Sequence, residues 1–236
     1  MNPISVSDPK VSPSLNPEFK SAVRQQTSLL APLERVCLHW LAGNLPSWVK
    51  PDHLTLLGLA AMFVAGLCYA LAKWWPPALL IVNLCLAINW FGDSLDGTLA
   101  RARNKQRPRY GFYVDHIIDA FGILFIICGL ALSGYMSLSI ALAMLVTYFL
   151  LSIDVYLATY TIGTFRLSFY KFSPTELRIL LAIGNIRVML HPTTHAFGDS
   201  RRFFDIGAVI AMSLMAVVLV VSVTRNTITL FRAERV

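Results

Sequence analysis

Charged residues are scarce in this chain. Of its 236 residues, 14% are Asp, Glu, Lys or Arg and 56% are hydrophobic, with a mean hydropathy of +0.61. An ordinary soluble domain carries about 25% charged residues. The shortage of charge therefore argues against a soluble globule and predicts a membrane protein.

Cysteine and histidine are also few, and their spacing matches no metal or redox motif. The four cysteines are scattered through apolar sequence without a CxxC pair, and the five histidines form no HExxH pattern. We interpret the cysteines as small core residues, which leaves the redox compartment undecided. His116 alone lies among clustered acids, between Asp115 and Asp119.

The first 30 residues lack an apolar run, so we expect no signal peptide. We interpret residues 1–17 as a flexible polar tail and 18–50 as a juxtamembrane segment with a helix over 18–44. Seven apolar residues of that segment fall near one helical face: Leu29, Leu30, Leu33, Val36, Cys37, Trp40 and Leu41. An amphipathic helix on the cytoplasmic membrane surface and a helix packed on the spans both fit this face.

Long apolar runs fill residues 51–236, which we interpret as one membrane domain. A crossing helix needs about 20 mostly apolar residues. The predicted fold class is all-α, a polytopic membrane protein with six transmembrane helices preceded by the amphipathic helix. The six spans are expected at 54–73, 77–97, 112–133, 136–161, 175–191 and 204–225, separated by Pro- and Gly-containing breaks.

Lysine and arginine are unevenly distributed around these spans. With the N-terminus in the cytoplasm, 16 of them fall on cytoplasmic segments and four on the other side. The positive-inside rule then places both termini and the loop at 102–110 in the cytoplasm. The net charge of +7 follows from this bias and from attraction to anionic lipid, so we expect no nucleic-acid partner.

Four aspartates interrupt the apolar sequence, where carboxylates are costly. Asp93 and Asp96 are three residues apart and Asp115 and Asp119 four apart, so each pair shares a helix face. Their two helices are expected to be antiparallel neighbours, with the pairs facing across a cytoplasmic cleft. Clustered carboxylates need cations, and an all-oxygen site suits two Mg²⁺ or Mn²⁺ ions that would clamp a phosphoryl group.

Glycine and arginine accompany these aspartates. Gly97 and Gly111 leave room for a bulky ligand near the helix backbone, and Arg101 lies one turn past Gly97, where it can meet a phosphate. Taken singly, such a glycine is often a packing notch and such an arginine a topology signal. Taken together with four aspartates, they predict a phosphoryl-transfer site.

Two other classes of membrane protein also bury acids. A cation channel or transporter would spread its acids through several spans rather than around one loop, and it remains the alternative of another class. An intramembrane aspartyl protease carries a GxGD element, whereas Trp-Phe-Gly precedes Asp93.

The complete pattern resembles the signature of the CDP-alcohol phosphotransferase family. It reads Asp93-x-x-Asp96-Gly97-x-x-Ala100-Arg101, nine residues, then Gly111-x-x-x-Asp115-x-x-x-Asp119. The stretch VKPDHLTLLGL at 49–59 is similar to the family's usual start of the first span. A catalytically inactive member would lack an aspartate, and none is missing.

The resemblance implies an enzyme of phospholipid biosynthesis that moves a phosphoryl-linked group from a CDP-linked donor to an alcohol acceptor and releases CMP. It implies that the four aspartates hold two divalent metals and that Asp119 is also the general base. It further implies a homodimer, and we expect the active site to face the cytoplasm of a bacterial inner membrane. The positions that match nucleotide contacts are Gly97, Ala100, Arg101 and Gly111.

The substrates are less constrained, and we favour CDP-diacylglycerol as the donor. Residues 159–185 also resemble eukaryotic choline and ethanolamine phosphotransferases, so CDP-choline or CDP-ethanolamine with diacylglycerol is the alternative. Asp154, in the fourth span, is a candidate polar partner of the cleft. Candidate acceptor-binding residues, some of which also serve as topology signals, are Arg166, Lys171, Glu176 and Arg178.

Overall fold

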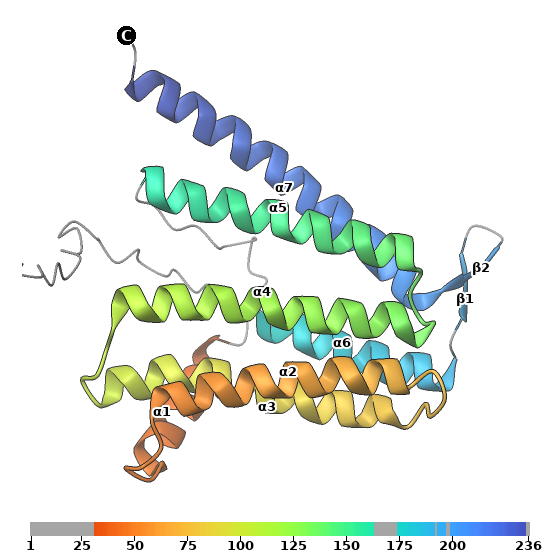
Figure 1. The fold of residues 1–236 in the computed structure, drawn as a ribbon, viewed down its shortest axis with the longest axis horizontal. Helices are drawn as coiled ribbons and strands as arrows, with labels where there is room; N and C mark the ends of the chain where they lie inside the picture. The colour runs from red at the N-terminus through yellow and green to blue at the C-terminus, as the bar shows by residue number, and fades with distance from the viewer. Residues whose placement is uncertain (1–30, 163–173, 192, 197–198, 235–236) are drawn as a thin grey trace, which may run out of the picture.

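A computed structural model of the chain describes residues 31–162, 174–191, 193–196 and 199–234. Helices make up nearly all of this part, which confirms the all-α class (Figure 1). A short antiparallel hairpin, pairing Thr193 with Arg202, occupies a stretch expected to be a loop. The elements in order are α1 (Ala31–Asn44), α2 (Pro51–Leu71), α3 (Ala78–Ala102), α4 (Pro108–Ser133), α5 (Leu138–Ile162), α6 (Pro174–Leu190), β1 (Thr193–Ala196), β2 (Asp199–Arg202) and α7 (Phe203–Ala233).

Within the part of the chain that the structure describes, five helices are long and apolar enough to cross a membrane: α2, α3, α4, α5 and α7. They coincide with five of the six predicted spans and point to a membrane protein. The span expected at 175–191 corresponds to α6, which has 17 residues and carries Arg178 and Arg187. The six-span count is therefore not confirmed.

Proline and glycine mark several helix ends. Pro51 and Pro108 begin α2 and α4, where the missing N–H of proline has no intrahelical partner to lose. Gly134 ends α4 with φ of +80°, a left-handed conformation that favours glycine. The helix α3 runs unbroken through the first part of the predicted signature, Asp93–Arg101, and the connection to α4 is only 103–107.

The helix α2 lies between α3 and α4 and packs extensively on both (Figure 1). Glycines allow direct backbone contact at these crossings. A Cβ on Gly92 would lie 2.5 Å from the carbonyl oxygen of Leu54, and one on Gly129 would lie 2.2 Å from that of Gly66. Because no side chain fits at such distances, the two helices that carry the aspartates are held closely against α2.

A buried polar chain, formed by Tyr69, Asn185 and Asn83, joins α6 to α2 and α3. Tyr69 Oη donates to Asn185 Oδ1 at 2.8 Å, and Asn185 Nδ2 donates to Asn83 Oδ1 at 2.7 Å. Asn83 Nδ2 in turn donates to the Ala182 carbonyl at 3.2 Å. Tyr69 and Asn185 are fully buried, so each bond satisfies a group that water cannot reach.

The helices α5 and α7 form a second layer that packs on α4 through α5 (Figure 1). Asp154 lies in the interface of these two helices. Ser222 Oγ donates to its carboxylate, and Asn226 Nδ2 donates to Ser222 Oγ at 3.2 Å. The expectation that Asp154 partners the cleft is wrong, because its hydrogen bond is to α7.

The helix α1 packs on α3 and buries Leu38 and Ala42. Val36 and Trp40, on the predicted apolar face, are 71% and 67% exposed. Packing on the spans is thus observed, and the membrane-surface role of the exposed face stays a prediction. Residues 18–30 of the predicted helix lie outside the described part of the chain.

Candidate active site

Three of the four predicted aspartates come together from α3 and α4, the two helices that pack on α2. Carboxylate oxygens of Asp93, Asp115 and Asp119 all lie within 4.8 Å of one another. Asp93 and Asp115 are half-buried and Asp119 is exposed. An oxygen-only set at this spacing fits a hard divalent cation such as Mg²⁺ or Mn²⁺.

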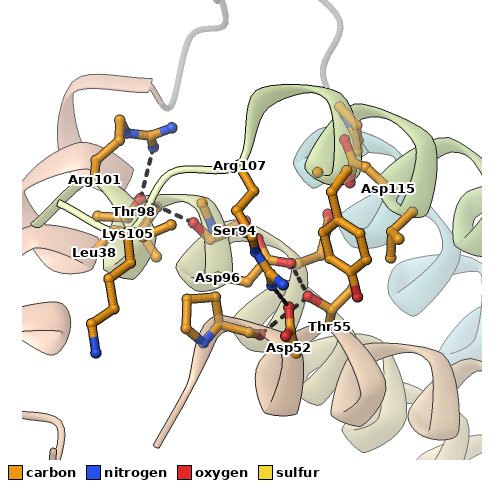
Figure 2. Close-up of a pocket in the computed structure, with 18 of the residues that line it drawn as sticks. Leu38, Asp52, Thr55, Ser94, Asp96, Thr98, Arg101, Lys105, Arg107 and Asp115 are labelled. Atoms are coloured by element: carbon orange, nitrogen blue, oxygen red, sulfur yellow. Dashed lines mark hydrogen bonds and ion pairs between the residues drawn. The ribbon is translucent and has the colours of Figure 1, made fainter. Parts of the chain in front are cut away.

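Asp96, the fourth, is held toward α2 instead. Thr55 Oγ1 donates to Asp96 Oδ2 at 2.6 Å (Figure 2). The Gly97 N–H donates to Asp96 Oδ1. The carboxylate of Asp96 therefore stays outside the group of three. Like Asp93 and Asp115, it lines the cavity described next. Thr55 was not predicted as a site residue, although it lies in the 49–59 stretch that resembled the family.

A cavity between α2, α3 and α4 adjoins the aspartates, and it is lined by all four predicted nucleotide-contacting residues. Arg101 extends over Gly97, since a Cβ on that glycine would lie 3.4 Å from Arg101 Nη1. Arg101 Nη2 also donates to Thr98 Oγ1 at 3.1 Å (Figure 2). A Cβ on Gly111 would meet nothing within 4 Å, which leaves this wall open to a ligand.

The rim of the cavity is basic and aromatic. The Arg107 guanidinium lies 4.0 Å from the centre of the Tyr110 ring and donates to Asp52 of α2 (Figure 2). This hydrogen bond raises the pKa of Arg107 above its usual value. With Lys105 and Arg101, also in the lining, the rim offers charges suited to phosphate oxygens. Sequence reasoning counted Lys105 and Arg107 only toward topology.

Of the predicted acceptor-binding residues, Arg178 lines the cavity. Its Nη2 donates to Asp93 Oδ2 at 2.7 Å and its Nε donates to Asn89 Oδ1 at 2.8 Å. Glu176 is half-buried one half-turn earlier on α6, whereas Arg166 and Lys171 lie outside the described residues. The structure thus places a predicted acceptor residue directly against a predicted metal ligand.

Sequence reasoning missed Glu34 of α1, which also lines the cavity. It is only 9% exposed, and it lies four residues before Leu38 on the buried face of α1. The sequence signal for it was the spacing of four residues that places Glu34 on one helix face with the apolar residues Leu38 and Ala42. Its Oε1 accepts from three donors: Trp90 Nε1 at 2.9 Å, Ser94 Oγ at 3.2 Å and Thr175 Oγ1 at 3.1 Å.

Segments of this chain are similar to known proteins. It is similar to cholinephosphotransferase 1 of Homo sapiens, at 32% identity over 115 residues, which are 45% of this chain and 28% of that protein. It is similar to archaetidylinositol phosphate synthase of Pyrococcus horikoshii, at 28% over 104 residues (44% and 52%). A third relative is CDP-diacylglycerol–serine O-phosphatidyltransferase of Encephalitozoon cuniculi, at 34% over 136 residues (53% and 34%).

The aligned segment spans between 28% and 52% of the length of these relatives. A family model described as CDP-alcohol phosphatidyltransferase matches a larger part of the chain, residues 48–223. That range contains the three clustered aspartates, the cavity lining from α2 to α6 and the five apolar helices up to most of α7. The resemblance of the signature is thereby confirmed, and the chain belongs to the CDP-alcohol phosphatidyltransferase family.

Proposed function

We propose that this protein transfers the phosphoryl-linked group of a CDP-linked donor, with CDP-diacylglycerol favoured, to an alcohol acceptor and releases CMP. One observation carries the proposal. Carboxylate oxygens of Asp93, Asp115 and Asp119 lie within 4.8 Å of one another, beside a cavity lined by the four expected nucleotide-contacting residues and a basic rim. Carboxylates suited to a metal and basic side chains suited to phosphates thus adjoin the same cavity.

In this proposal the four aspartates hold two divalent cations, Mg²⁺ or Mn²⁺. Such cations, when bound, stabilise negative charge on the phosphoryl oxygens. Asp96 joins the other three by turning its side chain away from Thr55. Three clustered carboxylates supply the oxygen donors that these cations prefer, which supports the assignment.

The remaining residues bind the donor or transfer a proton. Arg101, Lys105 and Arg107 bind the diphosphate of the donor, next to the open backbone at Gly111. Asp119 accepts the proton of the acceptor hydroxyl. A bond forms between the acceptor oxygen and the transferred phosphorus, the bond from that phosphorus to the CMP oxygen breaks, and CMP leaves with the electron pair.

A second candidate donor is CDP-choline or CDP-ethanolamine, with diacylglycerol as acceptor. The human and Xenopus laevis proteins named cholinephosphotransferase 1 are 32% and 30% identical to this chain over their aligned segments, which supports this branch. We extend the proposal to a homodimer in a bacterial inner membrane, with both termini and the site on the cytoplasmic side. The 16-to-4 bias of lysine and arginine supports that orientation.

The test uses the full chain purified in detergent. CMP release would be measured with radiolabelled CDP-diacylglycerol and a panel of alcohol acceptors, then with CDP-choline or CDP-ethanolamine plus diacylglycerol. We expect release with one combination, its loss in EDTA and in Asp93→Asn, and its return with Mg²⁺ or Mn²⁺ in the wild type. Asp154→Asn, an aspartate between α5 and α7, is the matched control and should stay active. Turnover that survives exhaustive EDTA treatment would contradict the metal assignment.

A further inference from the structure

Glu34 is a carboxylate whose two oxygens have different surroundings. All three donors described above bind Oε1, and they come from α3 and α6. Among the described residues, no donor binds Oε2. The side chain is nevertheless 91% buried and lines the cavity. Because Glu34 lines the cavity and these three donors all bind Oε1, Oε2 is the oxygen suited to a donor that a ligand brings.

The surroundings of Glu34 favour a positively charged donor. Glu34 and Asp93 both line the cavity, and both accept hydrogen bonds from the first turns of α6, from Thr175 and Arg178 respectively, so two carboxylates lie on the α6 side of the cavity. The described cation on this wall, Arg178, is hydrogen-bonded to Asp93 and Asn89. The basic residues of the rim belong to the end of α3 and to the connection 103–107 instead. An ammonium group would complement Glu34, whereas a second phosphate at this wall would be repelled.

We propose that Glu34 is a specificity-determining residue, whose Oε2 binds the ammonium group of an amine-bearing substrate and selects against a hydroxyl in the same place. This inference rests on the proposed function and adds a recognition point outside the four aspartates. The three bonds to Oε1 fix the carboxylate before a ligand arrives, so little rotamer entropy is lost on binding. The amine can belong to a CDP-linked aminoalcohol donor or to an amino-alcohol acceptor.

Two matched ligand pairs separate these sources. CDP-ethanolamine and CDP-glycerol are CDP-linked, and the first has an ammonium where the second has hydroxyls. Serine and glycerate differ in the same way as free acceptors. Binding to the full chain with Mg²⁺ would be measured by isothermal titration calorimetry, which requires no turnover. The wild type should prefer the amine of one pair by about ten-fold or more, the scale of a charged hydrogen bond.

Glu34→Gln tests the residue itself. Its amide oxygen can keep the bonds from Trp90, Ser94 and Thr175, while its amide NH₂ replaces Oε2 and opposes an incoming donor. The preference for the amine should fall to about two-fold or less, the loss expected for a charged hydrogen bond. Binding of CMP and the midpoint of thermal unfolding should not change. Glu234→Gln, at the exposed end of α7, is the matched control and should keep the preference.

Each outcome decides the inference. It fails if the wild type prefers the amine in neither pair, or if Glu34→Gln weakens both members of a pair equally, since Glu34 would then only connect α1, α3 and α6. If Glu34→Gln does not fold, Glu34→Asp is used instead, because it shortens the side chain by one methylene and moves the carboxylate away from the ligand. Glu34→Asp should also reduce the preference for the amine. An unchanged preference in Glu34→Asp overturns the inference. Amine-selective binding without CMP release from any donor would reject the proposed function and leave the recognition role supported.

Discussion

Replacing Arg178 by methionine would leave Asp93 without its cation in the metal-free protein. The two side chains are 15% and 24% exposed, and they are joined at 2.7 Å. Removing one partner of a fully buried ion pair costs about 3–5 kcal/mol, whereas an exposed pair contributes about 0–1 kcal/mol. For this intermediate burial we expect Arg178→Met to lower the free energy of unfolding by about 2 kcal/mol.

A divalent metal should reverse most of that loss. A cation held by Asp93 would neutralise the carboxylate in place of Arg178, so the variant should be nearly as stable as the wild type once metal is bound. In a chain of this length, 1 kcal/mol shifts Tm by about 2–4 °C. Metal should therefore raise the Tm of Arg178→Met by about 4–8 °C more than it raises that of the wild type.

The assay is thermal unfolding in detergent, with EDTA and then with excess Mg²⁺. Arg187→Met is the matched control, because Arg187 lies on the same helix but donates to the His191 carbonyl at 2.8 Å. Its metal-induced rise in Tm should equal that of the wild type. The reasoning is refuted if Arg178→Met also shows only the wild-type rise, since Arg178 and the metal would then not share Asp93.

Three further predictions concern the base, the topology and the packing. Asp119→Asn should keep donor binding while single-turnover rate falls roughly 100-fold or more; complete loss of donor binding would make Asp119 chiefly a metal ligand. Gln106→Cys should react with impermeant thiol reagents only after the membrane is opened, and labelling of intact cells would reverse the orientation. Gly129→Ala places a Cβ 2.2 Å from the Gly66 carbonyl and should lower the free energy of unfolding, measured by chemical denaturation, by at least about 1–3 kcal/mol. Gly43→Ala, whose Cβ would meet nothing within 4 Å, is the control and should not lower it. Equal stability of the two variants would contradict the backbone contact.

Much of the fold could be predicted because span length and apolar composition are properties of single segments. Five predicted spans overlap helices that meet both criteria. α6 was harder, because Arg178 and Arg187 lower its hydropathy and its polar partners are on other helices. The β1–β2 hairpin was missed because its short strands lack an alternating apolar pattern.

The candidate site was predictable where spacing along one helix decides which side chains meet. The interval of four residues placed Asp115 and Asp119 on one face of α4, and both lie in one cluster with Asp93. The orientation of Asp96 toward Thr55 could not be read in this way, because it depends on how α2 lies against α3. Glu34 was missed for a similar reason, since its three donors lie at least 56 residues away in sequence.

The buried polar chain from Tyr69 through Asn185 to Asn83 has a consequence for biosynthesis. An Arg costs about 2.5–3.5 kcal/mol at the centre of an inserting helix and less toward its ends, so Arg178 and Arg187 disfavour insertion of α6 by itself. Its hydrogen-bonding partners on α2 and α3 are synthesised earlier. We therefore expect α6 to dock on helices that are already in place, so that the direction of translation would set the order of assembly.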